Sequence, residues 1–248
     1  MEYAIETRNL VKHYSKGTVK AVNGLDLKIR KGEIYAFIGA NGSGKTTTID
    51  MISGVLLPTS GEMTVWGMDQ PKYRKKISRY LGIAPQEYSV YSDLSVWENI
   101  KFFGKLYGLS KQKVEDTAAT LLDILNLREK KNVVVENLSG GMKRRLSIAV
   151  ALIHQPPILL FDEATVGVDP ILRAYFWDYF RTLRDEGKTI LITSHVMDEA
   201  EKADRIGLIR KGILIEEGTP AELKEKYKVS TIEEIFILLS KGDGIADE

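Results

Sequence analysis

The sequence predicts an α/β fold with a mainly parallel β-sheet, an N-terminal antiparallel β-subdomain and an inserted α-helical subdomain. Three observations lead to this prediction: short apolar runs that alternate with helical patterns, β-prone runs between residues 4 and 29, and helix signals with almost no strand signals from 96 to 153. The 248 residues exceed the usual size of a single core, but no segment reads as a linker. We therefore expect one domain with two lobes.

The N-terminal runs predict an antiparallel sheet. Two β-prone runs, at 19–22 and 25–29, are set apart by Gly17 and by the pair Asn23-Gly24. Glycine and Asn-Gly are typical of tight turns between paired strands. The spacing therefore predicts a hairpin-like arrangement in which Asn23-Gly24 separates two short strands.

The parallel sheet is predicted by four compact apolar runs. The run at 34–38 ends in glycines and precedes a helical pattern at 46–52, which is the order strand, turn, helix. The runs at 158–161, 189–193 and 205–209 alternate with helical patterns, as strands do in βαβ units. Strands that are buried on both faces of such a sheet can be apolar throughout.

The central segment predicts a helical lobe, residues 87–157, inserted into an α/β core made of residues 1–86 and 158–228. A C-terminal helix and tail would follow at 229–248. Pro156-Pro157 would end the last helix of the lobe, because proline lacks the amide proton and restricts the residue before it. One helix of the lobe is marked by apolar residues with the spacing of a single helical face: Val114, Ala118, Leu121, Leu122 and Leu125.

Composition and charge narrow the class of protein. Hydrophobic residues make up 44% and charged residues 28% of the chain, as in ordinary globular proteins. The net charge of +1 gives no bulk reason to expect nucleic acid or an anionic membrane as partner. The absence of cysteine excludes disulfides and thiolate metal ligation. The N-terminus lacks a secretory signal and no apolar run reaches the roughly 20 residues of a membrane span, so we expect a cytoplasmic protein.

A phosphate-binding loop is predicted at residues 39–46, which match G-x-x-x-x-G-K-S/T between a predicted strand and a predicted helix. Glycines let successive backbone N–H groups surround phosphate oxygens, and the positive end of the following helix faces the same anion. Lys45 can reach the terminal phosphates, and the Thr46 hydroxyl can ligate Mg²⁺. A chance glycine turn containing Lys-Thr is the alternative. The expected nucleotide-binding residues are Gly39, Ala40, Asn41, Gly42, Ser43, Gly44, Lys45, Thr46 and Thr47.

Two carboxylates, Asp162 and Glu163, follow the apolar run at 158–161. The strand would deliver them to the carboxyl edge of the sheet, where open α/β folds bind ligands. Asp162 suits Mg²⁺, which prefers oxygen ligands, and Glu163 can accept a hydrogen bond from an attacking water and act as general base. Alone, such a pair is as often a turn or a helix cap. Together with the phosphate loop, it indicates a nucleotide-hydrolysing site.

A second candidate anion site is formed by residues 138–141, which read L-S-G-G and precede a helical run to residue 153. A serine and two glycines at a helix start can bind an anion, although a plain serine N-cap is the simpler interpretation. At this segment the chain resembles the ABC ATPases, whose signature sequence has the same core. The resemblance implies the ABC ATPase fold, with a RecA-like P-loop NTPase core, and contact of Ser139, Gly140 and Gly141 with ATP.

The resemblance extends from about residue 3 to residue 225 through four further motifs in the family's order. Tyr14 matches the aromatic loop and implies stacking on adenine. Gln86 matches the Q-loop, and Asp169 and His195 match the D-loop and the switch histidine. Packing for Tyr14, surface exposure for Gln86 and helix capping for Asp169 are the simpler alternatives. The implied catalytic residues are Lys45, Gln86, Glu163 and His195, and the implied Mg²⁺ ligands are Thr46, Gln86 and Asp162.

The resemblance also implies cofactors and partners. In the family, MgATP bound to residues 39–46 of one copy meets residues 139–141 of another in a head-to-tail dimer, which closes on ATP and opens after hydrolysis. The dimer, either a homodimer or a heterodimer with a second nucleotide-binding subunit, drives transport through a separate transmembrane permease subunit. We therefore expect a chain that lies at the cytoplasmic face of the membrane through its partner, is soluble when isolated and binds no nucleic acid.

Three segments resemble the ATP-binding subunits of ABC-2-type exporters for drugs, antibiotics or lipids: residues 141–146, 167–170 and 231–236. Importer subunits more often carry glutamine after the signature glycines, where this chain has Met142. The basic run at 143–145 is interpreted as a solvated helix face, like the run at 72–79, because short basic runs usually are.

One position departs from the family pattern. Ala164 follows Glu163, where the family usually has proline. Alanine leaves the backbone after the carboxylate less restricted. We therefore expect slower hydrolysis, because a looser backbone holds the attacking water less firmly.

Three other functions are weighed against transport. A non-transport ABC ATPase that acts on nucleic acid or the ribosome usually carries a long coiled-coil insertion or two cassettes, and neutral charge disfavours it. A small-molecule P-loop kinase does not account for the signature or for His195. A nucleotide-gated scaffold without hydrolysis does not account for Glu163.

Overall fold

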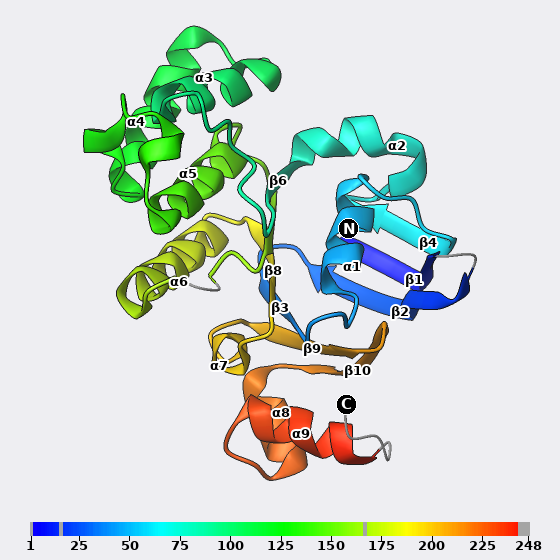
Figure 1. The fold of residues 1–248 in the computed structure, drawn as a ribbon. Coiled ribbons are helices and arrows are strands. Elements are labelled where there is room, and N and C mark those ends of the chain that lie inside the picture. The colour runs from blue at the N-terminus through cyan, green and yellow to red at the C-terminus, as the bar shows by residue number, and fades with distance from the viewer. Residues whose placement is uncertain (1, 15–16, 166–167, 243–248) are drawn as a thin grey trace.

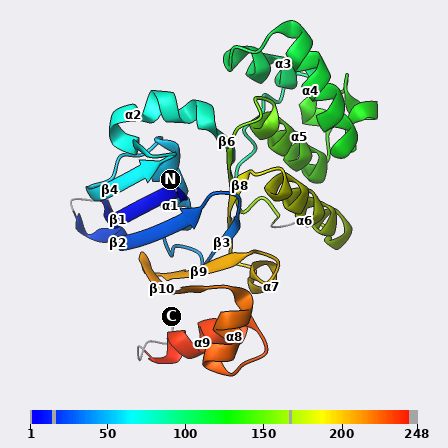
Figure 2. The ribbon, with the colours of Figure 1, turned by 180° about the vertical axis from the view of Figure 1, so that it is seen from behind.

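The computed structural model describes residues 2–14, 17–165 and 168–242, with side chains up to residue 240, and has the predicted α/β fold (Figures 1 and 2). Residues 243–248 of the predicted C-terminal segment and Gly167 of the exporter-like segment lie outside the described residues. The described strands form one antiparallel and one mainly parallel sheet. The N-terminal sheet lies on one side of the parallel sheet, and a helical lobe lies on the other (Figure 1).

The antiparallel sheet has the strand order β2-β1-β4-β5. Its strands are β1 (Tyr3–Tyr14), β2 (Val19–Arg30), β4 (Ser60–Val65) and β5 (Met68–Asp69).

The predicted break at Asn23-Gly24 is wrong, because residues 19–30 form a single strand. Gly24 has φ +80° and lies against Asn9, which has φ +46°, where the pairing between β1 and β2 shifts register. Such an irregularity bends a long strand without ending it. The Asn-Gly pair therefore marks a bulge in a long hairpin rather than a turn.

The second sheet has the order β10-β9-β3-β8-β7-β6, in which β10 alone pairs antiparallel to its neighbour. The four predicted strands are confirmed. The strands are β3 (Ile34–Ile38), β6 (Leu81–Ala84), β7 (Ile158–Asp162), β8 (Thr189–Ser194), β9 (Arg205–Arg210) and β10 (Ile213–Gly218).

Strand β3 shows why these runs are apolar throughout. Tyr35 and Phe37 pack into a core shared with the antiparallel sheet and helix α1 (Lys45–Ser53). Ile34, Ala36 and Ile38 alternate with them and pack into a second core on the opposite face. Because successive side chains of a strand point to opposite faces, a sheet covered on both sides needs apolar residues at every position.

The helical lobe contains α3 (Val96–Leu106), α4 (Lys111–Ile124) and α5 (Gly140–Leu152). The five predicted apolar residues of the α4 region are all buried, so that the predicted helical face is confirmed. A capping box of Ser95 and Glu98 begins α3, and the Ser139 side chain caps α5. The chain enters this lobe after β6 and leaves it into β7, so that α5 lies close to the sheet (Figure 1).

The remaining helices are α2 (Gln70–Ile77), α6 (Pro170–Asp185), α7 (Met197–Ala200), α8 (Pro220–Tyr227) and α9 (Ile232–Gly242). The expected cap of α6 is confirmed, since the Asp169 carboxylate accepts a hydrogen bond of 2.9 Å from the Leu172 amide. Short 3-10 turns lie at Ser78–Tyr80, Arg128–Lys130 and Val135–Asn137. Within the described ranges, no helix has the length and apolarity that a bilayer crossing requires.

The expectation of a solvated basic face at 143–145 is wrong at its middle residue. Arg144 is only 7% exposed, whereas the basic residues of the run at 72–79 are exposed as expected. Arg144 is buried because its guanidinium donates to two backbone carbonyls of the segment that follows β6. A sequence pattern of charge cannot reveal acceptors that belong to a distant part of the chain.

Candidate functional site

The phosphate loop connects β3 to α1, and its glycines are required by close backbone approaches. A side chain at Gly39 would place its Cβ 2.3 Å from the Ile209 carbonyl oxygen, and at Gly44 2.3 Å from that of Ala21. Gly42 and Gly44 have φ of +78° and +109°, which favour glycine. The loop is therefore curled tightly against the strands β2 and β9.

Donors at the start of α1 are available to an anion. Within the described ranges, no side chain caps this helix at Gly44, so that its first backbone N–H groups have no capping acceptor there. The Ser43 hydroxyl is buried and has no hydrogen-bond partner among the described residues. Uncapped amides and a buried free hydroxyl suit the phosphate groups of a nucleotide.

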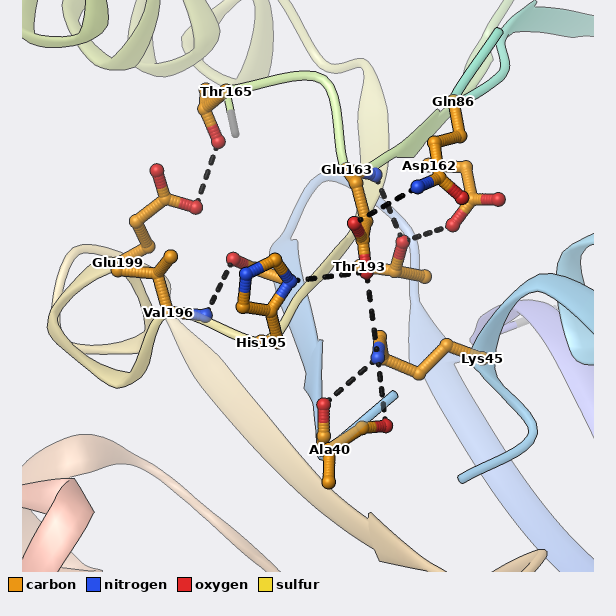
Figure 3. Close-up of polar contacts among 12 residues, drawn as sticks. Ala40, Lys45, Gln86, Asp162, Glu163, Thr165, Thr193, His195, Val196 and Glu199 are labelled. Carbon is orange, nitrogen blue, oxygen red and sulfur yellow. Dashed lines mark hydrogen bonds and ion pairs between the residues drawn. The ribbon is translucent and has the colours of Figure 1, made fainter. Parts of the chain in front are cut away.

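Lys45 lies buried beneath the loop. Its ammonium group donates to the carbonyl oxygens of Gly39 at 2.8 Å and Ala40 at 3.1 Å, and lies 3.5 Å from the Glu163 carboxylate (Figure 3). Burial lowers the pKa of Lys45, while the carboxylates of Glu163 and Asp162 act in the opposite direction. The loop thus holds a desolvated cation directly beside the acidic strand end.

Asp162 ends β7 and Glu163 follows it, and both are almost fully buried. Glu163 has φ +50°, an uncommon value for a residue with a side chain. Thr193, on the neighbouring strand β8, holds the pair in place: its hydroxyl donates to Asp162 Oδ1 and accepts from the Glu163 amide at 3.1 Å (Figure 3). Sequence reasoning missed Thr193, although parallel strands that end together could have indicated it.

Three predicted catalytic residues meet at Glu163. Besides Lys45, the Gln86 side-chain amide donates to Glu163 Oε2 at 3.4 Å, and His195 Nδ1 lies 3.3 Å from Glu163 Oε1 (Figure 3). Gln86 comes from the segment after β6 and His195 from the end of β8, so that the parallel sheet brings them to one edge. This carboxylate has partners from three separate segments.

The candidate Mg²⁺ ligands line one cleft. Thr46, Gln86 and Asp162 all contribute to a cleft of about 590 Å³ between α1 and the segment after β6. Hydroxyl, amide and carboxylate oxygens are the ligand types that Mg²⁺ takes in nucleotide sites, usually with several waters. The set therefore fits Mg²⁺ in chemistry and in location.

Tyr14 lies at a second cleft, of about 410 Å³, together with most of the phosphate loop and with Thr47. Tyr14 is 38% exposed, and the Lys12 ammonium lies 5.4 Å from the centre of its ring. An exposed aromatic ring beside a phosphate loop can stack on a nucleotide base. The structure thus brings Tyr14, the loop, Gln86 and Glu163 to one cleft.

The signature residues do not join this cluster. Ser139 and Gly140 are exposed at the start of α5, and none of residues 139–141 lines the two clefts. The Ser139 hydroxyl accepts from the Met142 amide at 3.3 Å, as a helix cap does. Asp169 is likewise exposed and caps α6. Within one chain, these four predicted ATP-contacting residues lie apart from the phosphate loop.

A polar cluster that sequence reasoning missed lies beside the site. Glu199 of α7 is 2% exposed, and its carboxylate accepts a hydrogen bond of 2.7 Å from the Thr165 hydroxyl (Figure 3). Arg173 of α6 lies 3.5 Å from the same carboxylate. The cluster ties the segment after Glu163 to the helix that follows His195. No sequence pattern indicated it, because its members come from three separate elements.

Comparison with known proteins gives a family match over most of the chain. A family model described as ABC transporter matches residues 22–166. The linearmycin resistance ATP-binding protein LnrL of Bacillus subtilis is 39% identical, over 94% of this chain and 75% of its own length. The Nod factor export ATP-binding protein I of Burkholderia orbicola is 40% identical, over 94% and 76%.

A third relative is much longer than this chain. The probable multidrug ABC transporter ATP-binding protein YbhF of Escherichia coli is 37% identical over 96% of this chain, which spans only 42% of that protein.

Solved structures share the fold. An ATP-binding subunit of an ABC transporter superposes with a TM-score of 0.88 at 24% identity, over 96% of this chain and 99% of that one. A dimeric ATP-binding cassette in a post-hydrolysis state, bound to ADP and Pi, superposes with a TM-score of 0.81 at 26% identity, over 87% and 98%. These matches confirm the expected ABC ATPase fold.

Proposed function

Because this chain belongs to the ABC transporter family, we propose that it binds and hydrolyses MgATP in a head-to-tail dimer and thereby drives export through a separate membrane subunit. The observation that carries the proposal is the meeting of Lys45, Gln86 and His195 at the Glu163 carboxylate, beside the uncapped start of α1. Phosphate donors, a buried cation and a candidate base are thus assembled at one edge of the sheet.

In this proposal, the phosphate loop and Lys45 bind the triphosphate, and Tyr14 stacks on the base. Thr46, Gln86 and Asp162 would hold Mg²⁺, which when bound neutralises phosphate charge and polarises the terminal phosphoryl group. Thr193 keeps Asp162 in place through its hydroxyl hydrogen bond.

Glu163 acts on the attacking water. Its carboxylate accepts a hydrogen bond and then the proton from this water as the water oxygen bonds to the terminal phosphorus. The bond between that phosphorus and the bridging oxygen breaks, and ADP leaves with its electron pair. His195 and Gln86 orient the carboxylate through the contacts at 3.3 and 3.4 Å. When the phosphates attract the Lys45 ammonium, its attraction to Glu163 weakens, which leaves the carboxylate oxygen free to accept the hydrogen bond from the water.

We infer the dimer from the distance that separates signature residues 139–141 from the phosphate loop within one chain. Exposed donors at the start of α5 have no part in the clefts of their own chain, and a second copy can bring them to the bound phosphates. One of the similar structures is a dimeric cassette bound to ADP and Pi, which supports this arrangement.

Export is inferred from the relatives. Three of them carry names that describe multidrug transport, antibiotic resistance and Nod factor export. We infer that this chain acts at the cytoplasmic face of a membrane with a transmembrane permease, and that the permease selects the exported molecule. The alternative, a non-transport ABC ATPase, has no support from these names.

The proposal is tested by measuring ATP hydrolysis with Mg²⁺ and the oligomeric state with ATP, for wild type and Glu163→Gln. We expect wild type to hydrolyse ATP, and Glu163→Gln to lose about 10²-fold or more in turnover while forming an ATP-dependent dimer. Glu129→Gln, at an exposed glutamate of the helical lobe, is the matched control and should behave as wild type. Equal turnover in Glu163→Gln and wild type would exclude Glu163 as the base.

A further inference from the structure

Arg144 is a buried cation in the helix that begins with the signature. It lies one turn after Ser139 and is 7% exposed, although basic neighbours surround it in sequence. A buried guanidinium is stable only when its donors find acceptors, because removal from water is costly for a charge. Its partners therefore indicate what it holds in place.

Both acceptors of Arg144 belong to the segment after β6. Its Nη1 donates to the Pro85 carbonyl oxygen at 2.7 Å and its Nη2 to that of Gln86 at 2.8 Å. The guanidinium also lies 5.2 Å from the centre of the Tyr88 ring, a favourable distance for a cation over an aromatic face. One side chain of the signature helix thus clamps two consecutive peptide groups of this segment.

Gln86 connects this clamp to the candidate base. Its backbone carbonyl accepts from Arg144, while its side-chain amide donates to Glu163 Oε2 at 3.4 Å. A shift of α5 that carries Arg144 with it would therefore shift the backbone of Gln86. The amide that contacts Glu163 would then move with the signature helix.

The far end of α5 is attached to the beginning of the same strand. His154 Nε2 lies 3.0 Å from the Leu81 carbonyl oxygen, and a Cβ at Gly82 would lie 2.2 Å from the Ala151 carbonyl oxygen. The C-terminal end of α5 is thus tied to the start of β6, and Arg144 ties the N-terminal half to the segment after it. Signature helix and strand are joined at two places.

Arg144 remains charged in this position, because a guanidinium does not lose its proton in proteins. Burial lowers its pKa, and Tyr88, Asp162 and Glu163 act in the opposite direction. A planar guanidinium can bond two neighbouring carbonyls at once, which the single ammonium of lysine does less well.

We propose that Arg144 is a positioning residue that couples the orientation of the signature helix to Gln86 and, through Gln86, to the Glu163 carboxylate. When a second copy binds to the exposed start of α5, the clamp transmits the new position of the helix to the segment at 85–88. This inference rests on the proposed ATPase function.

Arg145 offers a matched control. It is the same residue type one position later, and its Nη1 also lies within 3.3 Å of two backbone carbonyl oxygens, those of Leu125 and Asn126. Both acceptors lie directly after α4, inside the helical lobe. Loss of Arg145 therefore tests the cost of removing an arginine from α5 without disturbing the contact with Gln86.

The experiment is a double-mutant cycle on the turnover number of the full chain. Arg144→Met and Arg145→Met are each measured alone and in combination with Gln86→Ala, which keeps the backbone carbonyl but removes the side-chain amide. We expect Arg144→Met to lower kcat about tenfold in wild type and less than about twofold in Gln86→Ala. Arg145→Met should change kcat by the same factor in both backgrounds. Arg144→Lys should recover part of the loss.

Equal loss from Arg144→Met in both backgrounds would overturn the coupling and leave a purely structural role. A second readout does not depend on turnover: hydrogen exchange in residues 85–91 with and without ATP. We expect ATP to protect this segment in wild type and Arg145→Met but not in Arg144→Met. Protection in all three proteins would also overturn the coupling. Absent turnover in wild type would instead contradict the proposed function, and the exchange measurement would still decide the role of Arg144.

Discussion

The phosphate loop and the signature segment are both helix starts that can bind an anion, but they are built differently. In the loop, Gly39 and residues 43–45 are buried, and its glycines pack closely against neighbouring strands. The Lys45 ammonium donates to two carbonyl oxygens of the loop. Ser139 and Gly140 are exposed. Arg144 and His154 attach their helix to backbone carbonyls of β6 and of the segment after it. The first site is organised by its own chain, whereas the second is presented to solvent.

This difference indicates that the two sites have different roles in binding a nucleotide. A preorganised cationic pocket can bind a nucleotide without help, because its donors already point to one place. Donors exposed at the start of a helix complete a site only when another surface brings the anion to them. Each prediction below tests one side of this comparison.

The largest effect is expected when the phosphate loop is inactivated in one chain of a dimer and the signature segment in the other chain. Lys45→Ala removes the cation of the loop, and Ser139→Asp keeps a good helix cap but places a negative charge where phosphate would bind. Each variant alone should be almost inactive. In an equal mixture half of the dimers are mixed, and each has one intact site, so that about a quarter of wild-type hydrolysis should return.

Ser139→Asn is the control for this experiment, because asparagine caps a helix as well as aspartate does but adds no charge. It should retain more hydrolysis than Ser139→Asp. If the mixture stays inactive while both variants bind to each other, the site is not shared between copies.

The next effect concerns the loop alone. Lys45→Ala should weaken ATP binding by about 10²-fold, since truncating one member of a buried charge pair typically costs about 2–5 kcal/mol. Titration with a fluorescent ATP analogue measures it. Lys188→Ala is the control, because this lysine also donates to a carbonyl, that of Gln155, but far from the loop. Comparable losses in both variants would show that the effect is not specific to the loop.

A smaller effect is expected at His154, which follows the C-terminal end of the signature helix α5. Burial lowers the pKa of His154 to about 4, and Lys188 acts in the same direction while the Leu81 hydrogen bond opposes it. The folded state therefore binds fewer protons than the unfolded state, whose histidine titrates near 6.5. Stability should fall as the pH drops from 6.5 towards 4.

Urea unfolding at pH 7.5 and pH 5 measures this dependence. Wild type should lose about 1–2 kcal/mol more than His154→Gln over this interval. His154 stacks on Tyr107 with ring centres 3.6 Å apart. The His154→Gln variant lacks this stacking at both pH values, so that its loss does not affect the change in stability between pH 7.5 and pH 5. An equal pH dependence in both proteins would contradict a neutral His154 in the fold.

The smallest effect is expected at Ala164, the residue that follows Glu163. Ala164→Pro should raise turnover about twofold to fivefold, because proline restricts the backbone beside Glu163. The φ of +50° at Glu163 lies outside the right-handed helical region that proline disfavours in its predecessor. ATP affinity should not change. A slower variant with an unchanged melting temperature would count against the idea that Ala164 loosens the site.

Much of the fold could be predicted from local patterns. The strand at 34–38 is an unbroken apolar run, and the strand at 158–162 is apolar up to its last residue, Asp162. The helix caps at Ser139 and Asp169 have the residue types that caps require. The predicted break at Asn23-Gly24 is wrong, because the same pair can form a turn or a bulge and only the partner strand decides which. The predicted solvent exposure of Arg144 is wrong, because its acceptors lie 58 and 59 positions away in the chain.

The sequence by itself determined the chemical inventory of this protein: a glycine-rich loop with Lys45 and Thr46, two carboxylates after a strand, and a Ser-Gly-Gly helix start. Order and residue type were enough for these, since backbone curvature and strand direction are local properties. The tertiary structure alone decided that Lys45, Gln86 and His195 meet at one carboxylate, while none of residues 139–141 lines the cleft beside it. Contacts between residues from separate segments depend on which strands are neighbours in the sheet, and no local sequence pattern specifies that order.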